Sequence, residues 1–96
     1  MATTRFEWDA AKDIANQQKH GVGFAKAQFA FADPKRVIAA DTSHSEREVR
    51  FFCFGTVDGG VITVRFTYRR SVIRILGAGN WRKGKLIYER ENQIHG

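Results

Sequence analysis

The alternation of hydrophobic and polar residues predicts a helical start, a strand-rich middle and a helical end. Asp9 is a good N-cap for a helix over residues 10–20, and Gly21 stands where helices commonly end in the left-handed conformation. A second helix is predicted over residues 24–32, and Asp33-Pro34 ends it. Strands are then predicted over residues 36–40, 49–57, 61–69 and 72–76, and a last helix over residues 81–93.

Two turns connect the last three predicted strands. Asp58-Gly59 between alternating hydrophobic residues is the strongest short hairpin signal, and Arg70-Ser71 marks the next turn. The expected fold is therefore α+β, with two N-terminal helices packed on a four-stranded antiparallel meander and a C-terminal helix after it.

These turns set the strand register, and the register sorts the side chains onto two faces. Arg50 should lie opposite Thr67, Thr67 opposite Arg74, and Arg65 opposite Leu76. One face, which the two helices should cover, then carries Val49, Phe51, Cys53, Ile62, Val64, Phe66, Tyr68, Ile73 and Ile75. The other face carries Glu48, Arg50, Phe52, Phe54, Thr63, Arg65, Thr67, Arg69, Arg74 and Leu76.

Length and composition fit one small domain with a modest core. The chain has 96 residues and a single cysteine, Cys53, which fits a reducing compartment. Its start lacks a signal-peptide core, and no stretch approaches the roughly 20 apolar residues that span a bilayer. We therefore expect a soluble, cytoplasmic protein with no membrane partner.

Positive charge gathers in the second half of the chain. The net charge is +6, and because seven basic and seven acidic residues cancel over residues 1–48, all of it comes from residues 49–96. Such a concentration suggests a polyanionic partner, although an ordinary solvated surface also fits.

The row of Arg50, Thr67 and Arg74 makes RNA the favoured polyanion. Guanidinium groups hold phosphates in a fork, and neighbouring aromatic rings stack on bases. A solvated sheet face, or one covered by a partner, remains open; Phe52, Phe54 and Leu76 would suit such a partner. The candidate RNA-binding residues are Arg65, Thr67, Arg69, Trp81, Arg82 and Lys83.

Motifs along most of the chain resemble one toxin family. They are Phe6-Glu7-Trp8-Asp9, Lys12, Asn16, Lys19-His20-Gly21-Val22, Phe24, Ala27, Asp33-Pro34, His44-Ser45, Glu48, Arg50, Thr67, Arg69, Arg74-Ile75 and Tyr88. Together they resemble the BrnT toxins of type II toxin-antitoxin systems. The resemblance implies one BrnT-like domain over residues 1–96, a RelE-like fold and an endoribonuclease that arrests translation.

The resemblance also implies a protein partner. A BrnA-type antitoxin with a ribbon-helix-helix domain would neutralise the toxin, which would meet DNA only through that antitoxin. The chain departs from the family at Gly77-Ala78-Gly79, where Ser-Ala-Arg is expected, so an arginine at 79 is missing. Arg82 is a candidate to supply the lost charge, and a non-catalytic RNA- or antitoxin-binding module is the alternative function.

RNA cleavage of this kind needs a base, an acid and cations that neutralise the developing phosphorane. It needs no cofactor or metal, because the nucleophile is the 2′-hydroxyl group of the substrate. The three histidines lack the paired spacing of a zinc site. We assign Arg50 and Arg74 as the phosphate clamp, and His44 and Glu48 as the acid/base pair.

Structural roles remain open for several candidates. His44 would serve equally as a loop cap, and Glu48 would pair with Arg69 across the strands. Lys19 and His20 fit the end of a helix as well as a catalytic site. Trp81 is either a platform for base stacking or the core anchor of the last helix.

Overall fold

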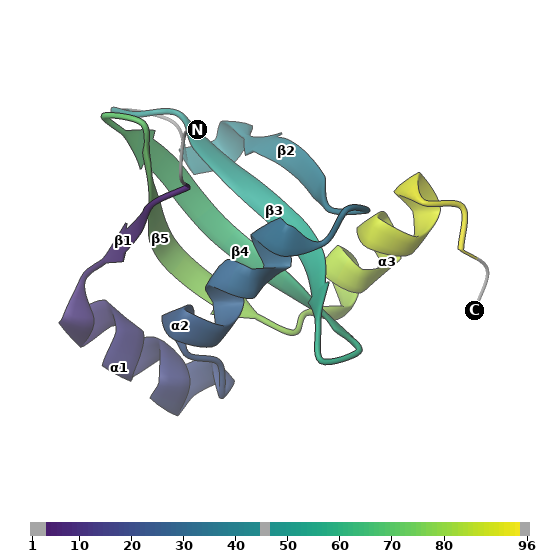
Figure 1. Ribbon diagram of the computed structural model, residues 1–96, viewed down its shortest axis with the longest axis horizontal. Helices are drawn as coiled ribbons and strands as arrows, with labels where there is room; N and C mark the ends of the chain where they lie inside the picture. The colour runs from purple at the N-terminus through teal and green to yellow at the C-terminus, as the bar shows by residue number, and fades with distance from the viewer. Residues whose placement is uncertain (1–3, 45–46, 95–96) are drawn as a thin grey trace.

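A five-stranded mixed sheet forms the centre of the protein (Figure 1). The computed structural model describes residues 4–44 and 47–94. Along the sheet the strand order is β1-β5-β4-β3-β2, and only the β1–β5 pair is parallel. The strands are β1 (Phe6–Trp8), β2 (Val37–Asp41), β3 (Arg50–Val57), β4 (Gly60–Arg69) and β5 (Val72–Gly79).

The predicted four-stranded antiparallel meander is wrong because a fifth strand joins its edge. In β1, Phe6 pairs with Ile73 and Trp8 with Ile75, in parallel with β5. The strand has only 3 residues, too few to show an alternation of hydrophobic and polar positions. Its formation depends on the long-range pairing with β5, which local sequence does not encode.

The three predicted helices form, but the second of them is divided into an α-helical turn and a 3₁₀ segment. They are α1 (Ala10–His20), α2 (Phe24–Ala27) and α3 (Arg82–Glu91), with the 3₁₀ turns η1 (Gln28–Ala32) and η2 (Thr42–His44). The caps of α1 are confirmed: Asp9 Oδ1 accepts from Lys12 N at 3.0 Å, and Gly21 has φ 70°. The second predicted helix tightens after one turn into η1.

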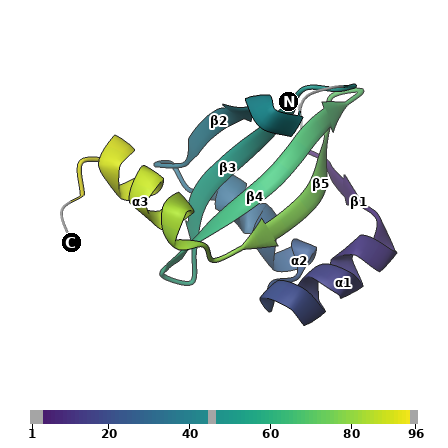
Figure 2. The same cartoon turned by 180° about the vertical axis from the view of Figure 1, so that it is seen from behind.

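The expected packing of both N-terminal helices on the sheet is wrong as well. The α2–η1 segment covers one face, where Phe24, Ala27 and Ala30 are buried in the core. In contrast, α1 has no buried residue and lies beside the β1–β5 edge (Figures 1 and 2). There Asn16 Nδ2 donates to the carbonyl oxygens of Val22 and Ala78, at 2.8 Å each.

The opposite face of the sheet is partly covered by α3. Gly84 of α3 packs so tightly against Thr63 and Phe54 that a Cβ at this position would overlap the Thr63 hydroxyl. Phe54 is therefore buried, whereas the sequence places it on an open surface. This leaves the part of the face nearer the β4–β5 turn open, and that part carries the arginines.

Both predicted turns are confirmed, and most of the register with them. Asp58 and Gly59 adopt φ of 52° and 83°, as this hairpin turn requires. Arg50 pairs with Thr67, and Thr67 with Arg74. The pairing of Arg65 with Leu76 is wrong: a β-bulge at Arg65/Phe66 shifts the partner to Gly77.

Among the described residues, no helix is long and apolar enough to cross a membrane.

Candidate functional site

The candidate site occupies the face of β3, β4 and β5 that lies opposite α2. We call it the arginine face, because Arg50, Arg65, Arg69 and Arg74 all project from it. Its central row is Arg50, Thr67 and Arg74, and the strand pairing adds one residue at each end of this row. Asp41 of β2 pairs with Arg50, and Glu7 of β1 pairs with Arg74. An acidic residue therefore stands at each end of the predicted clamp.

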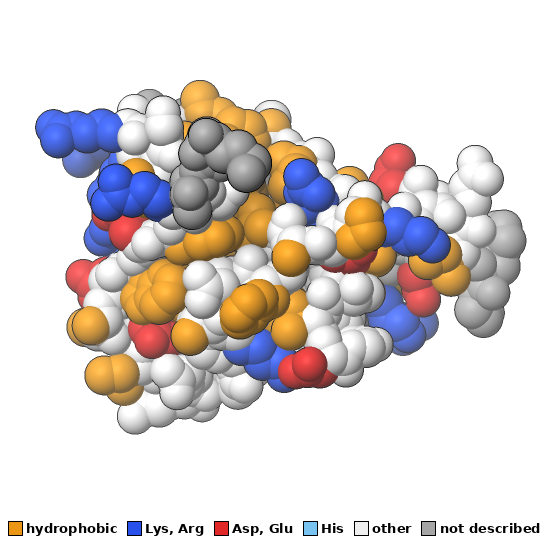
Figure 3. Space-filling view, viewed as in Figure 1, with side chains coloured by type: hydrophobic (Ala, Val, Ile, Leu, Met, Phe, Trp, Pro, Cys, Tyr) orange, Lys and Arg blue, Asp and Glu red, His pale blue; other side chains and the backbone are white. Residues whose placement is uncertain are grey.

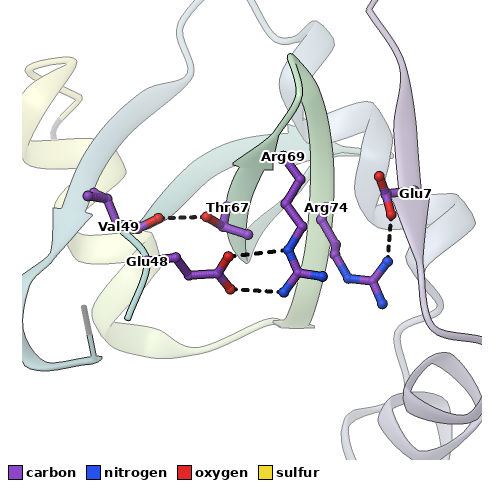
Figure 4. A network of polar contacts seen from close by, with 6 residues as sticks. All are labelled: Glu7, Glu48, Val49, Thr67, Arg69 and Arg74. Carbon is purple, nitrogen blue, oxygen red and sulfur yellow. Dashed lines mark hydrogen bonds and ion pairs between the residues drawn. The ribbon is translucent and has the colours of Figure 1, made fainter. Parts of the chain in front are cut away.

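The first clamp residue, Arg74, is engaged by Glu7. Its Nη1 atom donates to Glu7 Oε2 at 2.6 Å, and its side chain is only 22% exposed (Figure 4). Glu7 comes from the parallel strand that the sequence does not reveal. A phosphate that binds to Arg74 has to share or displace this carboxylate.

Glu48, predicted to transfer protons, is held by Arg69. Two hydrogen bonds join them: Arg69 Nε to Glu48 Oε2 at 3.2 Å, and Arg69 Nη2 to Oε1 at 3.0 Å (Figure 4). The hydrogen bond from Arg69 lowers the pKa of Glu48 and raises that of Arg69. The cross-strand pair left open by the sequence is thus confirmed, and a carboxylate with a lowered pKa is a weaker base at neutral pH.

Thr67, a predicted RNA-binding residue, is inaccessible. It is 1% exposed, and its hydroxyl donates to the carbonyl oxygen of Val49 at 2.7 Å (Figure 4). The bulky arginines around it cover this short side chain. Thr67 therefore ties β4 to the start of β3 and presents no group to RNA.

The other two predicted catalytic residues lie near the start of β3. Arg50 is half-buried in register between Asp41 and Thr67. His44 ends η2, and its side chain lies outside the described part of the structure. Its assignment as an acid or base therefore stays a prediction.

A groove next to this row gathers further cations. We call it the cationic groove; it has a volume of about 480 Å³, and its polar and aromatic lining is Lys12, Asn16, Lys19, His20, Arg65 and Trp81. Two elements supply its charge: α1, from the side that carries Asn16, and strand β4. The Nε atom of Arg65 is buried and has no hydrogen-bond partner among the described residues. Such a donor favours an acceptor brought by a ligand.

Lys12 and Asn16 are groove residues that our sequence assignment of the site omitted, and that assignment left the roles of Lys19 and His20 open. Lys12, Asn16 and Lys19 are spaced by four and three residues, which places them on one side of a helix. That spacing was a usable signal. What it lacked was the position of α1 against β5, which depends on the hydrogen bonds of Asn16 to the chain around Ala78.

Trp81 forms the wall at the end of the cationic groove. It precedes α3, is 41% exposed, and its indole ring meets the His20 ring edge-on at 5.0 Å between centroids. The indole also lies over Gly79, where a Cβ would come within 2.7 Å of it. Trp81 is therefore a partly open platform, and the space that an arginine at 79 would need is filled by its ring.

The remaining predicted RNA-binding residues, Arg82 and Lys83, are exposed at the start of α3. They follow Trp81 directly in the chain, so they add positive charge next to the cationic groove.

Cys53, the one cysteine of the chain, is a buried free thiol. Among residues 4–44 and 47–94, no three His, Cys, Asp or Glu side chains gather as metal ligands would. Burial raises the pKa of the Cys53 thiol to about 12, so it stays protonated at neutral pH.

Most of the chain matches one family model. Residues 8–84 match the ribonuclease toxin BrnT of type II toxin-antitoxin systems. The chain belongs to this BrnT family. No curated protein matches it. Membership implies RNA as the substrate and an antitoxin as the protein partner, so the resemblance seen in the sequence is confirmed.

Proposed function

We propose that this BrnT-family chain cleaves RNA without a metal, with the substrate on the arginine face and in the cationic groove. The observation that carries the proposal is the groove itself. Lys12, Lys19 and Arg65 surround one open space, and Arg65 brings a buried donor without a partner. Cations in such a site stabilise the charge that develops on a phosphorane.

In the proposed reaction, the 2′-oxygen of the substrate attacks the adjacent phosphorus. A base removes the 2′-hydroxyl proton, the bond from phosphorus to the 5′-oxygen breaks, and an acid protonates that oxygen. The products are a 2′,3′-cyclic phosphate and a 5′-hydroxyl end. Arg65, with Arg50 and Arg74 beside it, would neutralise the phosphorane.

His20 and His44 are the candidates for proton transfer. Imidazole exchanges protons near neutral pH, and His20 lines the groove. Glu48 stays a weaker candidate, because Arg69 holds its carboxylate in the charged form. A base at this site must be able to accept a proton at the pH of the cell.

The alternative is a non-catalytic module that binds RNA or an antitoxin. The ion pairs Glu7–Arg74 and Glu48–Arg69 favour it, because they occupy one clamp arginine, Arg74, and one predicted RNA-binding arginine, Arg69. Gly79, in place of an arginine, favours it as well.

Purified protein incubated with naked RNA in EDTA separates the two functions. The enzyme is supported by cleavage that leaves 2′,3′-cyclic phosphate ends. A gel shift without any cleavage would support the binding module instead.

In the cell, we propose that cleavage inhibits translation in the cytoplasm and that a BrnA-type antitoxin neutralises it. Acidic side chains of the antitoxin would oppose the arginines and keep RNA away. Exposed hydrophobic residues such as Phe29, Ile38 and Tyr68 belong to η1, β2 and β4, and the register turns Ile38 and Tyr68 away from the arginine face. Figure 3 shows hydrophobic surface on the side of the molecule that carries α2. The part of the arginine face around Arg50, Arg69 and Arg74 therefore offers mainly charge to a partner.

A further inference from the structure

A second groove adjoins the cationic groove, on the other side of Trp81. It lies between α3 and the β2–β3–β4 part of the sheet and has a volume of about 530 Å³, within the range of ligand pockets. We call it the apolar groove, because its lining is mostly apolar: Ala39, Ala40, Phe52, Phe54, Thr63, Trp81, Lys83, Gly84 and Ile87.

The two grooves adjoin at Trp81 and along β4. Trp81 lines both of them. On β4, Arg65 lines the cationic groove and Thr63 the apolar groove. They are two positions apart, so their side chains project on the same face about 7 Å from each other. The guanidinium group of Arg65, which would bind phosphate, therefore lies next to the apolar groove.

One polar group in the apolar groove lacks a partner. Thr63 is 5% exposed, and its hydroxyl has no hydrogen-bond partner among the described residues. A buried hydroxyl without a partner is costly and uncommon in native proteins. The hydroxyl lies under Gly84 of α3, so it can bond to the polar edge of a flat ligand only when α3 shifts to admit that ligand.

From this arrangement we infer that the apolar groove binds one base of the RNA, while the cationic groove binds the adjoining phosphate. A base is a flat apolar group with a polar edge, and aromatic walls such as Phe52 and Trp81 bind it by stacking. The inference rests on the proposed RNA substrate and adds a base-binding subsite to it. Lys83 at the groove adds positive charge for the backbone of the same strand.

The occupant follows from the charge around the groove. A hydrophobic side chain of a protein partner would fill the slot equally well, but that partner would have to bring separate acidic side chains to Lys12, Lys19 and Arg65. RNA satisfies both grooves with one nucleotide. An antitoxin side chain in the groove is therefore the competing outcome of the test.

The test measures binding of a short single-stranded RNA in which every 2′-hydroxyl is methylated, so that it is not cleaved. An abasic position is moved along this oligonucleotide one residue at a time. At one position, loss of the base should weaken binding to the wild type by about 5- to 100-fold, the range of one stacked base. Equal, small effects at all positions would overturn the inference.

Two variants test whether that base binds in the apolar groove. Ala39→Phe fills the groove from β2 and should lower affinity for the intact oligonucleotide to the level of the abasic one, with no further loss on the abasic one. Ile38→Phe is the matched control, because residue 38 is the neighbour on the opposite face of β2 and is 44% exposed. It should bind as the wild type does.

Thr63→Val tests the polar edge of the base. This change keeps the shape and removes only a hydroxyl without a partner, so thermal stability should not fall. Preference among the four bases at the sensitive position should decrease by at least a factor of about 5. An unchanged preference would remove Thr63 from the subsite.

Failure of this inference and of the proposed function give different results. If Ala39→Phe binds RNA like the wild type but no longer binds the cognate antitoxin, the groove belongs to the antitoxin and the inference is wrong. Cleavage of unmodified RNA by the wild type would then still support the enzyme. If the wild type cleaves no RNA, the proposed function fails regardless of the variants.

Discussion

At the scale of single residues, His20 is the candidate for proton transfer that lines the cationic groove. Its ring lies against Trp81 and lines the groove that also contains Lys12, Lys19 and Arg65. The groups around it on α1 and β4 are thus cationic, and its ring nitrogens share the groove with them. No other described imidazole reaches this groove.

If His20 transfers a proton, His20→Gln should lower the cleavage rate by roughly 100- to 10,000-fold. Glutamine keeps hydrogen bonding but does not exchange protons near neutrality, so one limb of the pH–rate profile should disappear. Binding of a non-cleavable RNA should change little. The same profile for His44→Gln is the comparison, and a profile unchanged in His20→Gln would leave proton transfer to another group.

Gly79 offers a second test at this scale. A Cβ on Gly79 would meet the indole of Trp81 at 2.7 Å, so Gly79→Ala should push this ring from its place and weaken RNA binding several-fold. Gly60→Ala is the matched control, because the nearest atom to its Cβ is 3.8 Å away and Gly60 does not line the cationic groove. The emission of Trp81, in a Trp8→Phe background, reports the movement. Equal spectra for both variants would contradict this packing.

At the scale of elements, Asp33 holds α3 against the end of η1 and β3. Tyr88 of α3 donates to Asp33 Oδ2 at 2.6 Å, and Thr56 donates to the same oxygen from its amide at 2.9 Å and its hydroxyl at 2.8 Å. Burial alone would raise the pKa of Asp33, but these bonds and one from Lys35 N outweigh it and lower the pKa to about 2.

This lowered pKa predicts a loss of stability in acid. Because the folded state holds the charged form, the stabilisation is complete above the unfolded pKa of 3.8 and disappears as the pH falls toward about 2. The loss should amount to about 1 to 2 kcal/mol of unfolding free energy. Denaturant titrations between pH 6 and about 2 measure it. Asp33→Asn should remove this part of the pH dependence; an identical dependence in that variant would refute the assignment.

Local signals predicted most elements, and long-range contacts account for the differences. The caps Asp9 and Gly21 gave α1 its bounds, and Asp58-Gly59 gave the hairpin and the Arg50–Thr67–Arg74 row. Nothing local marks the parallel strand β1, the bulge beside Arg65, or the burial of Phe54 by α3. The candidate site was therefore predicted as a row of arginines, while the ion pair of Arg74 and the contribution of α1 came only with the tertiary structure.

At the scale of the whole molecule, which has a net charge of +6, several cations gather around the cationic groove. Strand β4 and the start of α3 bring the basic second half of the chain to the arginine face, and α1 adds Lys12 and Lys19 from the first half. Charge of one sign around a groove raises the local concentration of a polyanion and speeds its association.

The salt dependence of RNA binding tests this distribution. Contacts of Lys12, Lys19 and Arg65 with phosphates of a single strand predict a log–log slope of about −2, and Arg65→Ala should reduce its magnitude by about 0.7. Arg90→Ala, in the last turn of α3, is the control and should keep the wild-type slope. A slope that Arg65→Ala leaves unaltered would mean that Arg65 does not contact phosphate.

The most direct test of the central claim concerns the nucleophile. An RNA oligonucleotide is compared with the same oligonucleotide carrying one 2′-deoxynucleotide at the cleaved position, both in EDTA. Attack by the 2′-oxygen predicts cleavage of the first and complete loss of cleavage at that position of the second, with binding nearly equal. Cleavage at the deoxy position at the original rate would contradict the account, because the oxygen that it makes the nucleophile is absent.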